Sequence, residues 1–145
     1  MSPIADSEII FESEHTVEGL EDQVRLEKWI KEVLLREKKR LERLAYFVVT
    51  DNELLAMNKE YLDHDTLTDI LTFPYSYDPI AADIYISFER VIDNASTLQC
   101  TADEEMRRVV IHGVLHMCGW TDKTESDNAA MRKREDECLA IWSSI

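Results

Sequence analysis

The scarcity of glycine and proline constrains the fold of this chain more than any other feature of its sequence. Only three glycines and three prolines occur among its 145 residues. These two residue types mark most tight turns and helix ends, so we expect few turns and long helices. Apolar residues make up 45% of the chain, which is enough for a hydrophobic core. The length fits a single domain over residues 1–145.

The pattern of apolar residues alternates between the periods of strands and helices. Short β-rich runs predict strands, and longer runs with apolar residues at helical spacing predict helices. The expected strands are 8–13, 44–50, 68–73 and 82–87, and the expected helices are 21–41, 52–62, 88–98, 102–118 and 124–142. We expect an irregular link with Pro74 and Pro79 between the last two strands. These elements predict an α+β fold, in which a mixed sheet of about four strands packs with about five helices.

Charge and cysteine content restrict the expected partners and compartment. The formal net charge is −14, and so acidic a surface argues against broad, non-specific binding to nucleic acids. The three cysteines form no CxxC pair, which indicates reduced thiols in a cytoplasmic protein. The chain lacks a signal-peptide pattern and an apolar run long enough to cross a bilayer, so we expect no membrane association. Basic groups such as residues 132–134 are interpreted as solvated helix faces rather than as a phosphate-binding patch.

The stretch HGVLHMCGWTD, residues 112–122, has the spacing of a metal site. Residues four apart on a helix share one face, so His112 and His116 can direct both imidazole rings at one point. Gly119 allows the chain to leave the helix and turn back, which places Asp122 as a third ligand. Three protein ligands with an open fourth position are typical of catalytic zinc. We therefore predict a catalytic metal site formed by these three residues, rather than three unrelated polar side chains.

The same spacing resembles that of the metzincin proteases. Those enzymes carry a glutamate directly after the first histidine, as the general base for peptide hydrolysis. This chain has Gly113 at that position, and glycine cannot accept a proton. Peptide hydrolysis is therefore disfavoured.

A second resemblance covers much more of the chain. Residues 112–122 resemble the H-G-x-L-H-L-x-G-Y-D-H pattern of the YbeY family of bacterial rRNA maturation factors. Three further blocks are similar to the family's L-N-x-x-Y-R, T-D-V-L-S-F-P and G-D-I-x-I-S patterns. They are MNKEYL (57–62), TDILTFP (68–74) and ADIYIS (82–87). The blocks follow one another in the family's order over residues 45–140.

The resemblance implies a metal-dependent endoribonuclease with a zincin-like metalloprotein fold. Proteins of this family act on single-stranded RNA in small-subunit rRNA processing and in ribosome quality control. The implied partners are rRNA and the ribosome or its small-subunit proteins, with no DNA and no membrane. The implied cofactor is one zinc ion, with His112 and His116 as the catalytic residues.

Two departures from the family pattern affect the expected chemistry. The third ligand is usually histidine in the family and is Asp122 here. Its carboxylate adds negative charge and shifts the metal preference towards manganese or another oxygen-tolerant ion. The family's arginine near the active site falls at Leu62, which cannot hold a phosphate. Lys59 or His64 is the predicted replacement as an RNA contact.

Several residues beside the motif have two interpretations. Asp69 and Asp83 either orient a ligand histidine by hydrogen bonding or cap a loop through backbone hydrogen bonds. Phe73, Tyr75 and Tyr77 alternate beside a predicted strand, where a half-buried structural role is favoured over base stacking. Two other functions remain for the whole chain. One is a ribosome-assembly binding factor with a structural metal, and the less favoured one is a metalloprotease-like hydrolase.

Overall fold

The structure is a computed structural model that describes residues 8–14, 16–62 and 68–145. Its elements are, in chain order, β1 (Glu8–Ser13), α1 (Gln23–Arg36), β2 (Leu41–Val49), α2 (Asp51–Leu62), β3 (Ile70–Tyr77), β4 (Ile80–Ser87), α3 (Phe88–Leu98), α4 (Ala102–Met117) and α5 (Glu125–Trp142). The predicted α+β class, with a four-stranded mixed sheet and five helices, is confirmed. None of the helices in the described ranges is long and apolar enough to span a bilayer.

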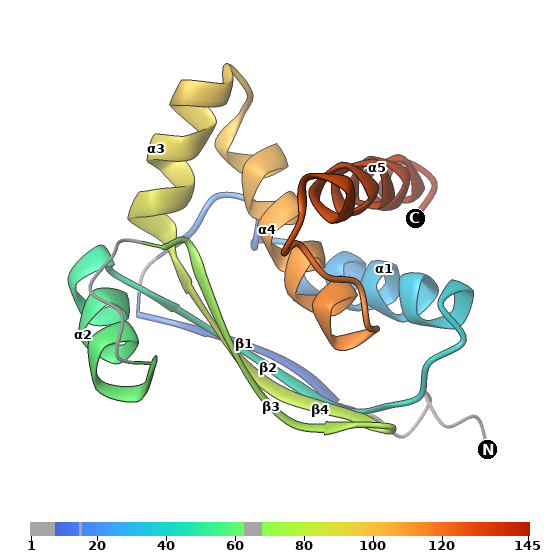
Figure 1. Ribbon diagram of the computed structural model, residues 1–145. Coiled ribbons are helices and arrows are strands. Elements are labelled where there is room, and N and C mark those ends of the chain that lie inside the picture. The colour runs from blue at the N-terminus through green and yellow to red at the C-terminus, as the bar shows by residue number, and fades with distance from the viewer. Residues whose placement is uncertain (1–7, 15, 63–67) are drawn as a thin grey trace.

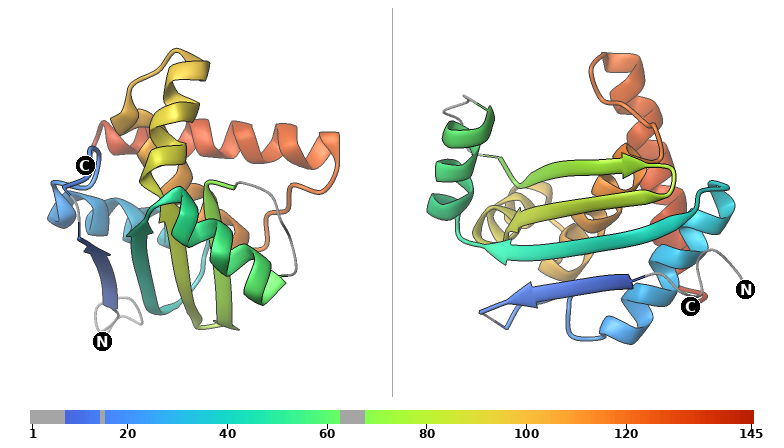
Figure 2. Two further views of the ribbon diagram at one scale, coloured as in Figure 1. Left: turned by 90° about the vertical axis from the view of Figure 1, so that its left-hand side faces the viewer. Right: turned by 90° about the horizontal axis from the view of Figure 1, so that it is seen from below.

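The four strands form one sheet in the order β1-β2-β4-β3. Strands β1, β2 and β4 are parallel, and the edge strand β3 is antiparallel to β4. Helices α1, α4 and α5 lie over one face of this sheet (Figure 1). Seen from the other side, most of the second face carries no helix, and α2 lies at one end of it (Figure 2). The core therefore lies between the sheet and the three helices.

Helix α4 crosses the centre of this core and carries the predicted metal motif at its C-terminal end. Its buried residues include Val110, Ile111, Val114 and Leu115. Gly113 lies directly on the sheet: a Cβ atom there would be 3.1 Å from the Cδ1 atoms of both Ile70 and Ile84. The absence of a side chain lets the helix approach β3 and β4 closely. This contact fixes the height of the motif above the sheet.

The ends of α4 and α5 that bound the site are capped by threonines. The Thr101 side chain accepts a hydrogen bond from the Glu104 amide at the start of α4. Thr124 likewise accepts from the Asp127 amide at the start of α5, where the sequence predicted a helix start. Three acids in the first turn of α4 further favour its N-terminus, because the helix dipole is positive there.

Helix α1 ends earlier than the sequence pattern predicted. It stops at Arg36 rather than near residue 41, and Lys38 adopts a left-handed backbone with φ of 58°. Strand β2 then begins at Leu41, whose side chain is buried and which pairs with Ile80 of β4. Pairing across the sheet therefore places Leu41, which the helical pattern assigned to the end of the helix, in a strand.

The expected irregular link between the last two strands was also wrong. Strand β3 continues through Pro74 to Tyr77, and only Asp78 and Pro79 separate it from β4. Proline is tolerated here because β3 is an edge strand and the register shifts between Pro74 and Ser76.

Candidate metal centre

Three side chains converge beside the C-terminal half of α4. The Nε2 atoms of His112 and His116 are 2.9 Å apart. Asp122 Oδ2 lies 3.4 Å from Nε2 of His112 and 3.3 Å from Nε2 of His116. Tetrahedral ligands at zinc–ligand distances of about 2.0–2.1 Å are about 3.3 Å from one another. The structure thus brings the three predicted ligands together at separations that suit one shared cation.

A glycine turn returns the chain to this point. Gly119 has a φ of 103°, and its amide donates to the His116 carbonyl. The Trp120 amide donates to the Leu115 carbonyl, so the helix ends in a Schellman motif. The Thr121 hydroxyl then donates to Asp127 Oδ2 at 2.8 Å, which ties the loop to α5. Asp122 lies inside this short, doubly anchored loop.

The hydrogen bonds of the two imidazole rings define which nitrogen carries the proton. His112 Nδ1 lies 2.6 Å from the Glu135 carboxylate, and His116 Nδ1 lies 3.0 Å from the Trp120 carbonyl oxygen. Both partners are acceptors, so each Nδ1–H donates, and a neutral ring then carries a lone pair on Nε2. Two nitrogen lone pairs and a carboxylate oxygen thus face one another. These acceptors repel, and a shared divalent cation removes the repulsion.

Glu135 of α5 is the functional residue that the sequence analysis missed. Its buried carboxylate accepts from His112 and also pairs with Arg108, whose Nη1 lies 3.0 Å away. A carboxylate that holds the far nitrogen of a ligand histidine fixes the ring's orientation and makes it a stronger donor to the metal. The signal was present in the sequence, because Glu135 lies on the helix face of the buried residues Met131 and Cys138. An acid on a buried helix face needs a partner.

The pKa of His112 is raised above its ordinary value. Burial by itself opposes protonation, but the hydrogen bond and charge of Glu135 outweigh it, with smaller contributions from the charges of Asp122 and Asp69. The same negative environment that favours a proton on His112 also favours a divalent cation. Metal and proton are therefore expected to compete for this imidazole.

The two aspartates proposed to orient a ligand histidine lie in different places: Asp69 directly precedes β3, and Asp83 lies within β4. Asp69 lines the cleft beside His112, and its carboxylate accepts a long hydrogen bond from Asn94 at 3.5 Å. Asp83 faces away from the metal centre, because its neighbour Ile84 packs against α4 and successive strand residues alternate in direction. The Tyr75 hydroxyl donates to Asp83 at 2.7 Å. The position of Asp83 therefore does not support a contact with a ligand histidine, and Glu135 makes that contact instead.

The other residues singled out in the sequence lie outside the metal centre where the structure describes them. Lys59 and Leu62 are exposed on α2, and His64 lies outside the described residues. The favoured half-buried role fits Phe73, whose ring meets Tyr61 and Tyr85 edge-on. The half-buried role does not fit Tyr75 and Tyr77, which are 69% and 59% exposed on the edge strand.

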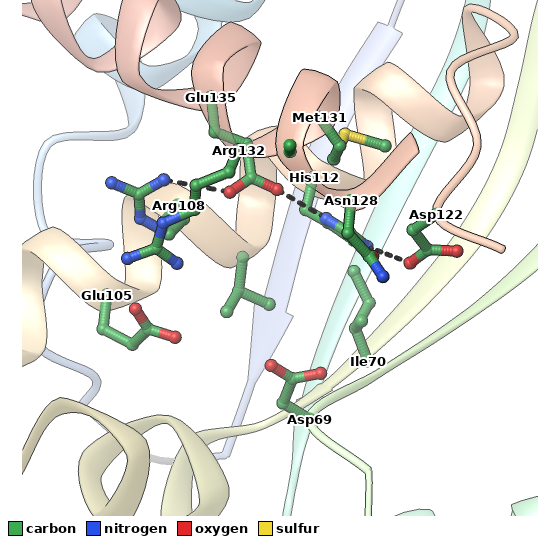
Figure 3. Close-up of a pocket in the computed structure, with 12 residues that line it drawn as sticks. Asp69, Ile70, Glu105, Arg108, His112, Asp122, Asn128, Met131, Arg132 and Glu135 are labelled. Carbon is green, nitrogen blue, oxygen red and sulfur yellow. Dashed lines mark hydrogen bonds and ion pairs between the residues drawn. The ribbon is translucent and has the colours of Figure 1, made fainter. Parts of the chain in front are cut away.

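A cleft of about 570 Å³ opens beside His112 and Asp122. Helices α4 and α5 form its walls, and β3 contributes Asp69 and Ile70 (Figure 3). Arg132 of α5 also lines this cleft, and no ion-pair partner for it is found in the described part of the chain. The metal centre therefore faces a polar space with room for a ligand.

Comparison with known proteins places this architecture in a family. The family model described as Endoribonuclease YbeY matches residues 9–143. A protein named Endoribonuclease YbeY from Flavobacterium psychrophilum is 48% identical over 115 residues, which cover 79% of this chain and 82% of that protein. One of the same name from Cytophaga hutchinsonii is 38% identical over 135 residues, 92% of this chain and 94% of that protein.

A solved structure agrees with the sequence comparisons. The solution structure of TM1509 from Thermotoga maritima superposes with a TM-score of 0.65 at 26% sequence identity. The match covers 94% of this chain and 91% of that protein. The family resemblance seen in the sequence motifs is confirmed: the chain belongs to the YbeY family.

Proposed function

We propose that this chain is a metal-dependent endoribonuclease that cleaves single-stranded RNA during maturation of small-subunit rRNA. The observation that carries the proposal is the convergence of two imidazole nitrogens and a carboxylate oxygen beside an open cleft. The names of the matching family model and of the relatives from Flavobacterium and Cytophaga support the reaction class.

The ligand set supports a catalytic rather than a structural metal. Structural zinc is normally closed by four protein ligands, whereas catalytic zinc has three and an open position. Here three residues form the metal-capable cluster within the described ranges, and their side chains are 22%, 31% and 39% exposed. This exposure leaves one side of the site accessible from the cleft. A ribosome-assembly factor with a purely structural metal is therefore disfavoured.

The proposed chemistry assigns separate tasks to the residues of this site. A divalent cation here supplies Lewis-acid assistance to attack on an RNA phosphodiester. His112, His116 and Asp122 hold that cation, and Glu135 fixes the His112 ring in its ligating tautomer. Arg132 has a guanidinium suited to a phosphate group of the substrate. We therefore add Arg132, which lines the cleft, to the predicted RNA contacts Lys59 and His64.

We propose zinc as the resident ion, with manganese as the alternative. The three ligand-atom separations lie between 2.9 and 3.4 Å. The ligand atoms of a tetrahedral zinc ion are expected at separations near the upper end of this range, and those of an octahedral ion of similar size at separations near the lower end. The carboxylate of Asp122 supports the alternative, because oxygen ligands suit manganese.

The proposed location and recruitment follow from charge and thiol chemistry. Cys100, Cys118 and Cys138 are all free, which supports a reducing compartment and hence the cytoplasm. The net charge of −14 slows encounter with naked RNA. We therefore propose that the ribosome or its small-subunit proteins bring the chain to its substrate, including in ribosome quality control.

The test is cleavage of a single-stranded RNA by protein stripped of metal with a chelator. Activity should be lost on stripping and should return with zinc or manganese. His116→Ala should remain inactive with either ion, whereas Glu125→Ala, an exposed change in the first turn of α5, should keep activity. Full activity of His116→Ala, or of the stripped protein, would contradict the proposal.

A further inference from the structure

Glu105 is a buried acid that points into the cleft beside the metal centre. It lies in the first turn of α4, is only 5% exposed and lines the cleft together with Asp69, Asn128 and Arg132. Figure 3 shows its carboxylate and that of Asp69 on the same side of this cleft. Within the described part of the chain, the Glu105 carboxylate has neither a hydrogen-bond donor nor an ion-pair partner.

We infer that this end of the cleft is a nucleobase subsite, in which the Glu105 carboxylate accepts the N1–H and N2–H groups of a guanine. The inference rests on the proposed nuclease function and names the base that the nuclease prefers beside its cleavage site. Asp69 supplies a second acceptor in the same cleft. Arg132 lies on the α5 wall, where it can bind the phosphate attached to that base.

The energetics of Glu105 call for a ligand with donors. The Glu105 oxygens open to the cleft and are not among the fully enclosed polar atoms, so burial of the side chain costs part of their hydration and leaves them within reach of a ligand. Burial and the charge of Asp69 raise the pKa of Glu105 and outweigh the charges of Arg108 and Arg132, which lower it; burial also raises the pKa of Asp69. Two cations lie near the acid without contacting it: Arg108 is bound by Glu135 and Asp136, and Arg132 acts on Glu105 through its charge, with no ion pair between them in the described part of the chain. A ligand that brings N–H groups would remove this cost.

Charge and geometry favour a nucleobase over a phosphate or a divalent cation as the ligand of Glu105 and Asp69. A phosphate is repelled by two carboxylates. A divalent cation needs converging ligands, and the metal-capable cluster found among the described residues is His112, His116 and Asp122, which does not include Glu105. Unpaired RNA bases expose their Watson–Crick edges to side chains. Guanine presents two adjacent donors there, which match the two oxygens of one carboxylate.

The size and position of the cleft fit a nucleotide. Its volume of about 570 Å³ lies within the usual range for small-molecule sites. Glu105 and His112 lie two turns apart on one face of α4, because their spacing of seven residues returns to that face. Asn128 and Arg132 are four apart on α5 and face the same space. A base at Glu105 can thus belong to a nucleotide whose backbone runs towards the metal centre.

The experiment is isothermal titration of zinc-loaded protein with GMP, IMP and AMP. IMP differs from GMP only by the missing N2 amino group, so wild-type protein should bind GMP about tenfold more tightly than IMP. Glu105→Gln should lower GMP affinity about tenfold and bring it close to that of IMP. Glu104→Gln, the exposed neighbour on the same helix, should leave the GMP preference unchanged. Asp69→Asn is the second variant if Glu105→Gln does not fold, and it should weaken GMP binding.

Three results would overturn the inference. They are equal affinities for GMP and IMP, unchanged GMP binding by Glu105→Gln, and a second manganese ion that displaces GMP in wild type but not in Glu105→Gln. The nuclease proposal fails separately. GMP preference without RNA cleavage would contradict the nuclease function, whereas cleavage without a guanine preference would contradict the subsite alone.

Discussion

The carboxylate of Glu135 lies 2.6 Å from Nδ1 of His112 and thereby joins α5 to the metal centre on α4. Arg108 holds the same carboxylate from the other side, with a distance of 3.0 Å. Helix α5 thus does more than cover the core: its Glu135 holds the ring of His112, the proposed metal ligand that α4 provides. Several variants separate this orienting role from the roles of the ligands themselves.

Glu135→Gln should weaken metal binding without abolishing it. The amide can still accept from His112 Nδ1, but the negative charge that strengthens the histidine as a ligand is lost. We expect zinc affinity to fall about 10- to 100-fold, as measured by competition with a chromophoric chelator. Glu137→Gln, an exposed change on the same helix, is the control. Wild-type affinity in Glu135→Gln would show that the contact does not support the metal.

Asp122→His should shift the metal preference towards zinc. The change replaces an oxygen ligand by the imidazole usual in the family, and softer nitrogen ligands disfavour manganese. Asp122→Ala should instead weaken both ions, because only two protein ligands remain. Titration of each apoprotein with zinc and with manganese gives the two affinities. A ratio of the two affinities that is the same in wild type and in Asp122→His would contradict a ligand role for residue 122.

Gly113→Ala should destabilise the fold by close contact with the sheet. The added Cβ would meet the Cδ1 atoms of Ile70 and Ile84 at 3.1 Å, and overpacking of this kind costs about 1–3 kcal/mol, of which the better helix propensity of alanine offsets about 1 kcal/mol. Gly119→Ala should also destabilise, but through its φ of 103°, because nothing lies within 4 Å of its added Cβ. Gly119→Asn should therefore recover stability, since asparagine tolerates a left-handed backbone better than alanine does. Urea unfolding measures all three, and a Gly113→Ala variant that is about 1 kcal/mol more stable than wild type, as expected from helix propensity alone, would argue against the close approach of α4.

Removal of the Glu105 charge should stabilise the metal-free protein, and more so as the pH rises. Burial and Asp69 raise the pKa of Glu105 in the folded state above its ordinary value of 4.5. The folded state then binds more protons than the unfolded state as the pH rises above 4.5, so stability decreases through the folded pKa. Glu105→Gln stays neutral. Its melting temperature should match wild type at or below pH 4.5 and exceed it near pH 8, whereas Glu104→Gln should show no such trend. A pH-independent difference would contradict the prediction.

Arg132→Ala should reduce RNA affinity and its dependence on salt. Loss of one phosphate contact lowers the slope of log affinity against log salt by about 0.7 for a single strand. Lys133→Ala removes the same charge from the next, exposed position and tests for a general effect of charge. Binding of a non-cleavable single-stranded RNA over a series of salt concentrations gives both slopes. Equal slopes for the two variants would assign no special contact to Arg132.

Local sequence signals predicted the elements of this fold but not all of their ends. Hydrophobic periodicity and helix-capping residues are signals that span only a few residues. They were sufficient to predict the start of α5 at Thr124 and the presence of all four strands. The end of α1 and the full length of β3 depend on partners far away in the sequence. Leu41 pairs with Ile80, and Pro74 is tolerated only because β3 lies at the sheet edge. No single stretch contains that information.

The candidate site shows the same division between local and distant information. The proposed ligands His112, His116 and Asp122 are predicted from helical periodicity and a glycine turn, which are local features. Glu135 acts on His112 across 23 residues, through the packing of α5 on α4. The sequence indicates only that an acid lies on a buried helix face. Its partner becomes visible once the two helices are placed together.

X-ray diffraction from zinc-loaded crystals, recorded on both sides of the zinc absorption edge, tests the central claim most directly. One anomalous peak is expected among His112 Nε2, His116 Nε2 and Asp122 Oδ2, at about 2.0–2.2 Å from each atom and with no fourth protein ligand. A peak elsewhere, or one closed by a fourth side chain, would contradict a catalytic metal at this place.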